Sequence, residues 1–346
     1  MSLKKETKIK LSLLFLIPFF SWFFLHTFFF EDNQKFDQLA LGEEVVKVTN
    51  YINDKPILCG SFAQLDKCLS YLKDKSFNKK ILWIGNSQLN SVNQGNLNTT
   101  KTASYRVSKY FYDRNVGVIT FAAPNISFQE YSAIIEYLKK KKIDLDMIIL
   151  PLVFDDTRED GVRKSFLVNK EKNKKIKKTL QEISESKIVI FLDKQIKWNE
   201  IRSAAQGKIY TFLYQSRNFV FNIKPTSTRK SIKPIFDKNI LSLEKILKKL
   251  KKENIKTILY VAPLRNDIKI PYSEIEYSYF KRHAKNLSTK YSSNFYNLEN
   301  IVPGFLWGKK AGTKLGVDTE VDFMHFKEQG HEILGKNIIT ILNKLL

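Results

Sequence analysis

The sequence predicts a doubly wound α/β domain behind one N-terminal membrane anchor. Three observations support this prediction: an uncharged apolar run at residues 11–30, five short apolar runs after residue 79, and amphipathic stretches between those runs. The chain has 346 residues, of which 43% are hydrophobic and 27% are charged. This composition excludes a disordered chain, and only 2 Cys exclude a disulfide-dense scaffold.

The predicted anchor at residues 11–30 contains no Asp, Glu, Lys or Arg and is long enough to cross a hydrocarbon layer of about 30 Å. Four Lys precede it and acidic residues follow it, so the positive-inside rule places residues 1–10 in the cytoplasm and the rest outside, in the periplasm or the cell exterior. A cleaved signal peptide is the alternative. The run ends in Thr27 and three Phe, which form a poor cleavage site, so an uncleaved single-pass anchor is favoured.

The net charge is strongly positive. Lys and Arg number 58 and Asp and Glu 35, which gives 58 − 35 = +23. Such a charge is typical of nucleic-acid binding, but an outward-facing domain meets no chromosome, so nucleic acid is not expected as a partner. An anionic lipid, a phosphate-bearing polymer or an acidic glycan of the envelope is the expected partner. A Lys-rich solvated surface without a partner is the open alternative.

Residues 31–78 are predicted to be a polar connector with a short helix over 62–74. The connector contains Cys59 and Cys68. Outside the cytoplasm these two residues can form a disulfide, while two buried free thiols are the other interpretation, and their spacing does not decide between them. Neither Cys has the neighbours of a metal site.

The domain itself is predicted over residues 79–346. Its strand-like runs are 79–85, 116–122, 146–153, 256–264 and, more weakly, 294–300. The helix-like stretches are 103–113, 128–142, 242–254, 273–291 and 327–346. Residues 160–240 interrupt this alternation with basic and aromatic stretches, and we interpret them as a helical insertion. That insertion could line a groove for an anionic polymer, but a surface elaboration with its own small core is favoured.

Ser87 follows the first predicted strand directly. Ligand sites of doubly wound sheets lie at the carboxyl ends of the strands, so this serine is well placed to act as a nucleophile with a general base. The competing interpretation is an ordinary helix N-cap.

Asp322 and His325 lie near the other end of the domain, in an Asp-x-x-His pattern before the last predicted helix. One loop can bring both side chains together, with His325 accepting the Ser87 proton and Asp322 fixing the imidazole tautomer. The other histidines fit this role less well: His26 lies in the predicted anchor, His283 in a helix pattern, and His331 at an expected solvated position of the last helix.

Taken together, Gly85-Asn86-Ser87 and Asp322-x-x-His325 resemble the SGNH (GDSL-like) hydrolase superfamily. The resemblance implies a three-layer α/β/α sandwich with a five-stranded, mostly parallel sheet over residues 79–346. It also implies a Ser-His-Asp triad of Ser87, His325 and Asp322, with no metal or organic cofactor. Asn86 stands where the family has the Asp of its G-D-S block, a position outside the triad.

The middle blocks of the family match less well. The family stabilises the oxyanion with the Ser amide, a Gly of the second block and an Asn of the third. The second block has no such Gly here, and Asn125 offers a side-chain amide instead, beside the Ser87 amide. Asp155 and Asp156 occupy the third block and cannot donate while ionised. Arg158 is expected to pair with Asp155 or Glu159.

The anchor makes the chain similar to membrane-anchored SGNH-like envelope proteins, including those of lipoteichoic acid D-alanylation and alginate O-acetylation. This resemblance implies a membrane-bound O-acyltransferase as a partner. The expected function is that of an acyltransferase or esterase acting on an acyl group of an extracytoplasmic envelope glycan or lipid. The alternative is a catalytically inactive SGNH-like protein that binds a glycan or lipid.

Overall fold

The computed structural model describes residues 44–346 except 75–76, 164–165 and 167–197. The chain divides into a larger compact unit, formed by Glu43–Asn173, Lys224–Lys310 and Thr319–Leu346, and a smaller unit that includes Lys174–Ile223 and Ala311–Asp318. The predicted cytoplasmic tail and anchor, residues 1–30, lie outside the described residues. Among the helices that the structure describes, none combines the length and the apolar character needed to span a bilayer.

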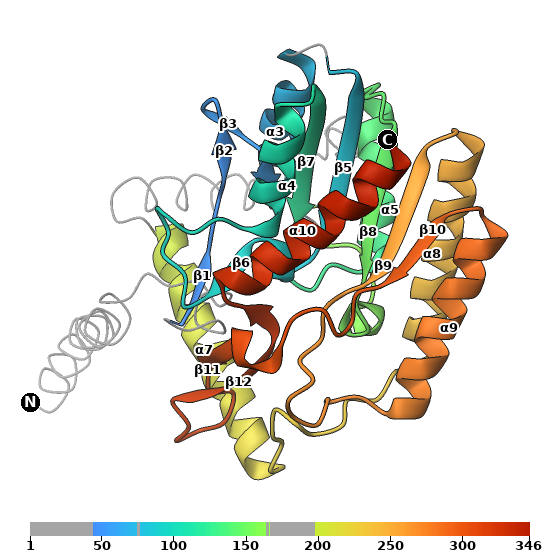
Figure 1. Ribbon diagram of the computed structural model, residues 1–346. Helices are drawn as coiled ribbons and strands as arrows, with labels where there is room; N and C mark the ends of the chain where they lie inside the picture. The colour runs from blue at the N-terminus through green and yellow to red at the C-terminus, as the bar shows by residue number, and fades with distance from the viewer. Residues whose placement is uncertain (1–43, 75–76, 164–165, 167–197) are drawn as a thin grey trace, which may run out of the picture. The chain divides into compact units, whose positions relative to one another are not determined.

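A parallel six-stranded sheet forms the centre of the larger unit, in the order β10-β9-β8-β5-β7-β4 (Figure 1). Its strands are β4 (Leu58–Cys59), β5 (Lys79–Gly85), β7 (Val116–Ala122), β8 (Met147–Leu152), β9 (Lys256–Val261) and β10 (Asn294–Asn297). All five predicted strands are present. The predicted strand number was wrong, because β4 pairs with β7 and adds a sixth strand at the edge.

The central strands are apolar on both sides because both faces of the sheet are covered. Along β5, Leu82 and Ile84 contribute to one buried core, while Ile81 and Trp83 contribute to a second core. This alternation follows from the two-residue period of a strand, and it explains why the strands appear in the sequence as continuous apolar runs.

Helices cover the two faces unequally (Figure 1). Four helices contribute to the core that contains Leu82: α3 (Phe62–Asp74), α5 (Phe128–Lys140), α8 (Lys233–Lys252) and α9 (Glu274–Lys290). Two helices contribute to the core that contains Trp83: α4 (Ala103–Tyr112) and α10 (Glu328–Leu345). The α5 helix begins with a capping box, in which Ser127 and Glu130 satisfy each other's backbone amides.

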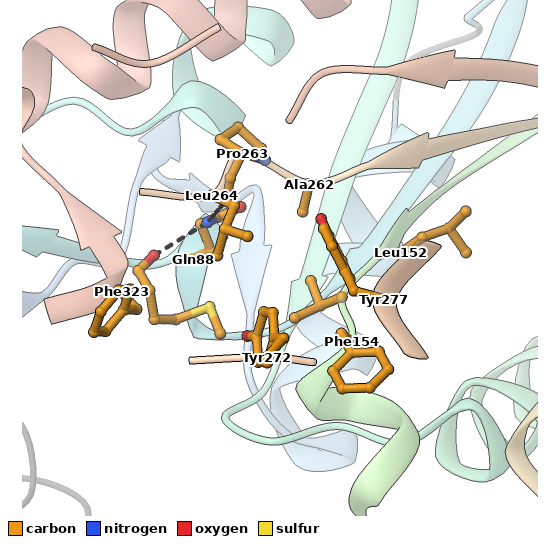
Figure 2. Close-up of a pocket in the computed structure, with 11 residues that line it drawn as sticks. Gln88, Leu152, Phe154, Ala262, Pro263, Leu264, Tyr272, Tyr277 and Phe323 are labelled. Atoms are coloured by element: carbon orange, nitrogen blue, oxygen red, sulfur yellow. Dashed lines mark hydrogen bonds between the residues drawn. The ribbon is translucent and has the colours of Figure 1, made fainter. Parts of the chain in front are cut away.

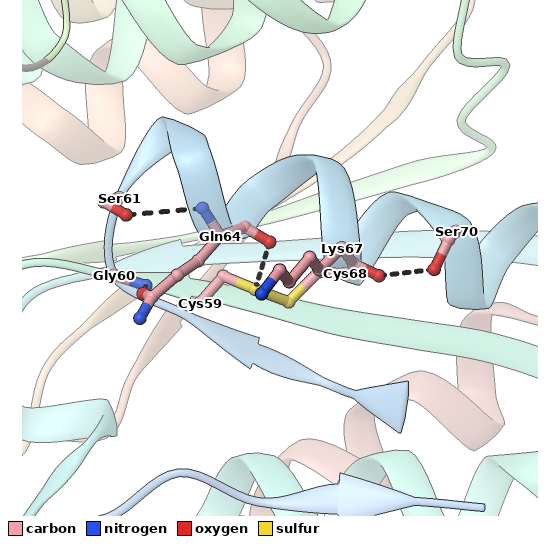
Figure 3. Close-up of a disulfide and its surroundings, with 7 residues drawn as sticks. All are labelled: Cys59, Gly60, Ser61, Gln64, Lys67, Cys68 and Ser70. Atoms are coloured by element: carbon pink, nitrogen blue, oxygen red, sulfur yellow. Dashed lines mark hydrogen bonds between the residues drawn. A yellow bond between two sulfur atoms is a disulfide. The ribbon is translucent and has the colours of Figure 1, made fainter. Parts of the chain in front are cut away.

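Residues 44–78 are not the connector that the sequence suggested. They supply β4 and α3, whose side chains lie in the core. Cys59 of β4 and Cys68 of α3 form a disulfide with a Cα–Cα distance of 6.4 Å, which settles the open choice between a disulfide and free thiols (Figure 3). Both residues are buried. The α/β unit therefore begins well before residue 79.

Short strands and turns complete the larger unit. The β1 strand (Val45–Lys47), which precedes the sheet strands, pairs antiparallel with β6 (Ser91–Asn93), which follows β5, and β2 (Tyr51–Ile52) pairs with β3 (Lys55–Pro56). A ribbon of β11 (Trp307–Ala311) and β12 (Thr319–Phe326) precedes α10. Single 3₁₀ turns are η1 (Ser87–Leu89), η2 (Asp155–Arg158) and η4 (Gly304–Leu306).

The region of the predicted insertion, residues 160–240, contains one long described helix, α7 (Trp198–Val220), which belongs to the smaller unit. The α8 helix starts at Lys233, earlier than the predicted residue 242, with Pro234 in its first turn. Proline is well tolerated there because the first amides of a helix have no intrahelical acceptor.

Candidate active site

Ser87 lies at the carboxyl end of β5, in the first turn after the strand. Asn86 caps this turn by accepting a hydrogen bond from the Gln88 amide at 3.0 Å. The preceding Gly85 has no room for a side chain, since a Cβ would come within 2.5 Å of Leu89 and 2.9 Å of Pro151. The sequence Gly-Asn-Ser thus makes a tight, capped turn at the edge where ligand sites of parallel sheets lie.

Asp322 and His325 lie on β12, not in a loop as the sequence suggested. Residues three apart on a regular strand point to opposite faces. The backbone here departs from a regular strand, because Asp322 Oδ1 accepts hydrogen bonds from the Met324 amide at 2.8 Å and the His325 amide at 3.1 Å. These two hydrogen bonds stabilise a local turn, which places the His325 side chain on the same side as the Asp322 carboxylate.

The structure brings together the three residues that the sequence selected. His325 Nε2 lies 2.9 Å from Ser87 Oγ, and His325 Nδ1 lies 2.8 Å from Asp322 Oδ2. Ser87 is 8% exposed and His325 is 5% exposed, whereas Asp322 is fully buried. Ser87 and His325 are 238 residues apart in sequence, so the fold brings the hydroxyl and the imidazole together.

The electrostatics of this group favour one tautomer. Burial alone would raise the pKa of Asp322, but the charge and hydrogen bond of His325, together with the Met324 amide, lower that pKa overall. An ionised Asp322 accepts a hydrogen bond from the Nδ1–H of His325, and the proton stays on the ring. Nε2 then has a lone pair directed at the Ser87 hydroxyl, which is the arrangement that a general base requires.

Gln88 connects the Ser87 turn to two other loops, a role that the sequence did not indicate. Its Nε2 donates to the carbonyl oxygens of Pro263 at 2.9 Å and Met324 at 3.1 Å (Figure 2). The side chain is 2% exposed. Gln88 is next to Ser87 and Met324 is next to His325, so this one amide joins the two halves of the site.

Asp156 lies under the same turn. Both of its carboxylate oxygens are 3.3 Å from Asn86 Nδ2, and the residue is 1% exposed. Burial raises the pKa of Asp156 well above its usual range, and the hydrogen bond from Asn86 opposes that rise only in part. From the sequence, Asp156 was expected to be ionised, whereas its buried surroundings favour the neutral acid.

Asn125, the predicted side-chain donor to an oxyanion, lies in the loop between β7 and α5. It is exposed, with a left-handed φ of 48°. Among the described residues, no hydrogen bond joins its side chain to Ser87 or His325. Asn90 instead reaches the end of β7, where its Nδ2 donates to the Ala122 carbonyl at 3.1 Å.

An apolar pocket lies beside the site, at the ends of β8 and β9 (Figure 2). Its lining includes Gln88, Phe154, Leu264, Tyr272, Tyr277 and Met324. The Tyr272 hydroxyl donates to Asp155 at 3.0 Å, and Asp155 also pairs with Arg229. Arg158 binds Asp155 at 3.1 Å, which confirms the predicted structural pairing.

His331 is buried, so the expected solvated position was wrong. Its Nδ1 accepts from the Ala103 amide and its Nε2 lies 3.3 Å from the Ser91 carbonyl. Desolvation by burial lowers the pKa of His331 to about 3, which keeps the ring neutral. His331 therefore holds α4, α10 and β6 together.

Among the described residues, no three His, Cys, Asp or Glu side chains gather as a metal site would need.

Comparisons with solved structures give distant matches to this chain. No protein-family model and no curated protein matches the sequence. An acetylxylan esterase from Geobacillus stearothermophilus matches with 10% identity and a TM-score of 0.41, over 76% of this chain and 94% of the esterase. A protein from Bacteroides fragilis whose name reads "putative acylhydrolase" matches with 9% identity and a TM-score of 0.40, over 78% of this chain and 89% of that chain.

An α/β hydrolase from the metagenome of Lake Arreo, Spain, matches with 8% identity and a TM-score of 0.43, over 78% of this chain and 97% of that chain. At these identities and TM-scores, the matches do not assign an activity to the chain.

Proposed function

We propose that this chain is a serine-dependent acyltransferase or esterase, anchored in the membrane by residues 11–30 and facing the periplasm or the cell exterior. The observation that supports the chemistry is the continuous hydrogen-bonded series from Ser87 through His325 to Asp322, with contacts of 2.9 and 2.8 Å. Both contacts fall within the range expected of a nucleophile and an oriented base.

The reaction has two steps. In the first step, Ser87 Oγ attacks the acyl carbonyl carbon while its proton moves to His325 Nε2. The imidazolium then donates that proton to the departing alcohol oxygen, which leaves an acyl-enzyme. A hydroxyl of an envelope glycan, or water, then attacks the acyl-enzyme carbonyl carbon and gives its proton to His325 Nε2. His325 passes this proton to Ser87 Oγ as the bond between Ser87 Oγ and the acyl carbon breaks, which restores the free serine. Asp322 stabilises the imidazolium at both steps, and the Ser87 amide is the oxyanion donor that we propose.

Transfer to an acceptor is favoured over hydrolysis because the predicted anchor and the charge of +23 would keep the domain beside anionic envelope polymers. A membrane-bound O-acyltransferase that supplies the acyl group is the proposed partner. No step of this mechanism requires a metal or an organic cofactor.

The experiment is covalent labelling with a fluorophosphonate probe. The full chain in detergent micelles should be labelled, and Ser87→Ala should abolish the labelling. Ser70→Ala is the matched control, since Ser70 is a half-buried residue of α3 whose hydroxyl donates to the Lys67 carbonyl of the same helix. Labelling that persists in Ser87→Ala would contradict the assignment of the nucleophile.

A second candidate function is a non-catalytic protein that binds a glycan or lipid with the same scaffold. It is favoured by the exposed position of Asn125 and by Asp155 and Asp156, which replace the amide donor of the family's third block. Intact chains that are folded by circular dichroism but resist the probe at every pH would favour this second function.

A further inference from the structure

On the described part of the α7 helix of the smaller unit, one side carries polar residues that bind backbone and another side carries exposed apolar residues. Asn218 is 1% exposed, and its Nδ2 donates to the Thr313 carbonyl at 2.7 Å. Gln215 Nε2 donates to the Gly312 carbonyl at 2.9 Å. The polar side of α7 thus binds the backbone of residues 311–318, which belong to the same compact unit.

Large apolar side chains project from the rest of this helix into solvent. We call them the α7 apolar face: Ile209 (51% exposed), Phe212 (59%), Leu213 (56%), Phe219 (56%), Val220 (72%) and, just after the helix, Phe221 (70%). The spacing of residues 209, 212, 213 and 220 places them on one side of a helix. A water-soluble surface helix has the opposite arrangement, so this face is expected to bind an apolar partner.

Cationic side chains border the α7 apolar face. The Arg217 guanidinium lies 4.5 Å from the centre of the Tyr214 ring, and Lys314 Nζ lies 5.6 Å from the centre of the Phe219 ring. Residues 207–224 also include Lys208 and Lys224 and contain no Asp or Glu. Aromatic and aliphatic side chains bordered by Lys and Arg are typical of helices that lie in the interface of an anionic bilayer.

We infer that the α7 apolar face lies in the headgroup region of a bilayer that contains anionic lipid. Charge complementarity favours lipid headgroups over a neutral protein surface. The inference also draws on the predicted anchor at residues 11–30, which would hold the chain at a bilayer and raise the local concentration of lipid around α7. The acyl-transfer chemistry at Ser87 is not needed for it.

The test uses the full chain, reconstituted in vesicles of phosphatidylcholine and phosphatidylglycerol, with a polarity-sensitive fluorophore on Cys introduced as Phe212→Cys. Cys59 and Cys68 are joined, so the new thiol is the one that reacts. We expect blue-shifted emission and strong quenching by lipids that carry a nitroxide on the acyl chain. The matched control is Ile275→Cys on α9, which is 84% exposed in the larger unit and should show neither effect.

Three results would overturn the inference. Blue-shifted emission without nitroxide quenching would mean that another part of this chain covers α7. Emission that depends on the protein-to-lipid ratio would indicate a second copy as the partner. Equal quenching in vesicles of phosphatidylcholine alone would remove the anionic requirement. Resistance of the protein to alkaline extraction tests the anchor separately, so failure of the anchor and failure of the α7 inference can be distinguished.

Discussion

The Gln88 side chain donates a hydrogen bond of 3.1 Å to the Met324 carbonyl, which joins the turn that carries Ser87 to the strand that carries His325. A second hydrogen bond from the same nitrogen, to the Pro263 carbonyl at 2.9 Å, holds the loop after β9. The distance between nucleophile and base therefore depends on a side chain that belongs to neither.

Gln88→Glu should slow the labelling of Ser87 by roughly 10- to 100-fold, because a carboxylate cannot donate to two carbonyl oxygens and displaces the two loops. The rate constant of fluorophosphonate labelling is the measurement, with the thermal midpoint recorded alongside. Gln64→Glu is the matched control, since the Gln64 side chain accepts from the Gly60 amide through Oε1 and keeps that acceptor as Glu. Equal rates in wild type and Gln88→Glu would show that Gln88 does not position the site.

Asp322→Asn should reduce the labelling rate at neutral pH by on the order of a thousandfold. Asn retains an oxygen for the Met324 and His325 amides, so the local turn persists, but its Nδ2 then faces His325 Nδ1 and favours the wrong tautomer. Asp318→Asn, at an exposed position of the preceding turn, is the control and should label as wild type. A loss of less than tenfold in Asp322→Asn would argue against a base oriented by this carboxylate.

Asp156→Asn should raise the free energy of unfolding, and the gain should grow between pH 4 and pH 8. The folded-state pKa of Asp156 is raised by burial above its unfolded value. The folded state therefore holds a proton that the unfolded state releases, so the wild type loses stability as pH rises above the unfolded pKa and toward the folded pKa. Urea titrations of both proteins at several pH values test this, and a gain that is independent of pH would contradict it.

His331 should make stability fall on acidification in the pH range below 6.5. Its pKa is lowered to about 3 in the folded state, so the unfolded chain binds a proton that the buried ring does not. This contribution is present above pH 6.5 and is lost as pH falls toward about 3. His331→Gln should be less stable at pH 7 but show a flatter pH dependence in the same urea titrations. Parallel curves for the two proteins would exclude His331 as the source.

The sequence predicted the sheet well where strands are long and apolar. The bounds of β5 and β7 agree with the predicted runs 79–85 and 116–122, because a strand buried on both faces leaves a continuous apolar signal. The β4 strand has two residues, Leu58 and Cys59, and no periodicity can show in so short an element. Its place depends on pairing with β7, which is a tertiary contact.

In the candidate site, too, features set by local sequence were predicted and features set by tertiary contacts were not. Ser87, Asp322 and His325 were selected from local patterns, a serine directly after a strand and an Asp-x-x-His spacing, and the structure brings their side chains together. Gln88 was missed because its role depends on a partner 236 residues away. Asp156 was expected to be ionised, because its burial beside Asn86, 70 residues away, could not be seen in the sequence. Burial also reversed the expectation for His331, since the helix pattern could not show which side of α10 meets α4.

The disulfide between Cys59 and Cys68 has a consequence for association between chains. The β4 strand is the outer strand of the sheet beside β7, and an open sheet edge can recruit strands from other molecules. Here the edge strand is two residues long and is covalently tied to α3, which packs over it. At this edge of the sheet, little backbone is therefore open to a strand from a neighbouring copy, which disfavours edge-to-edge association through β4.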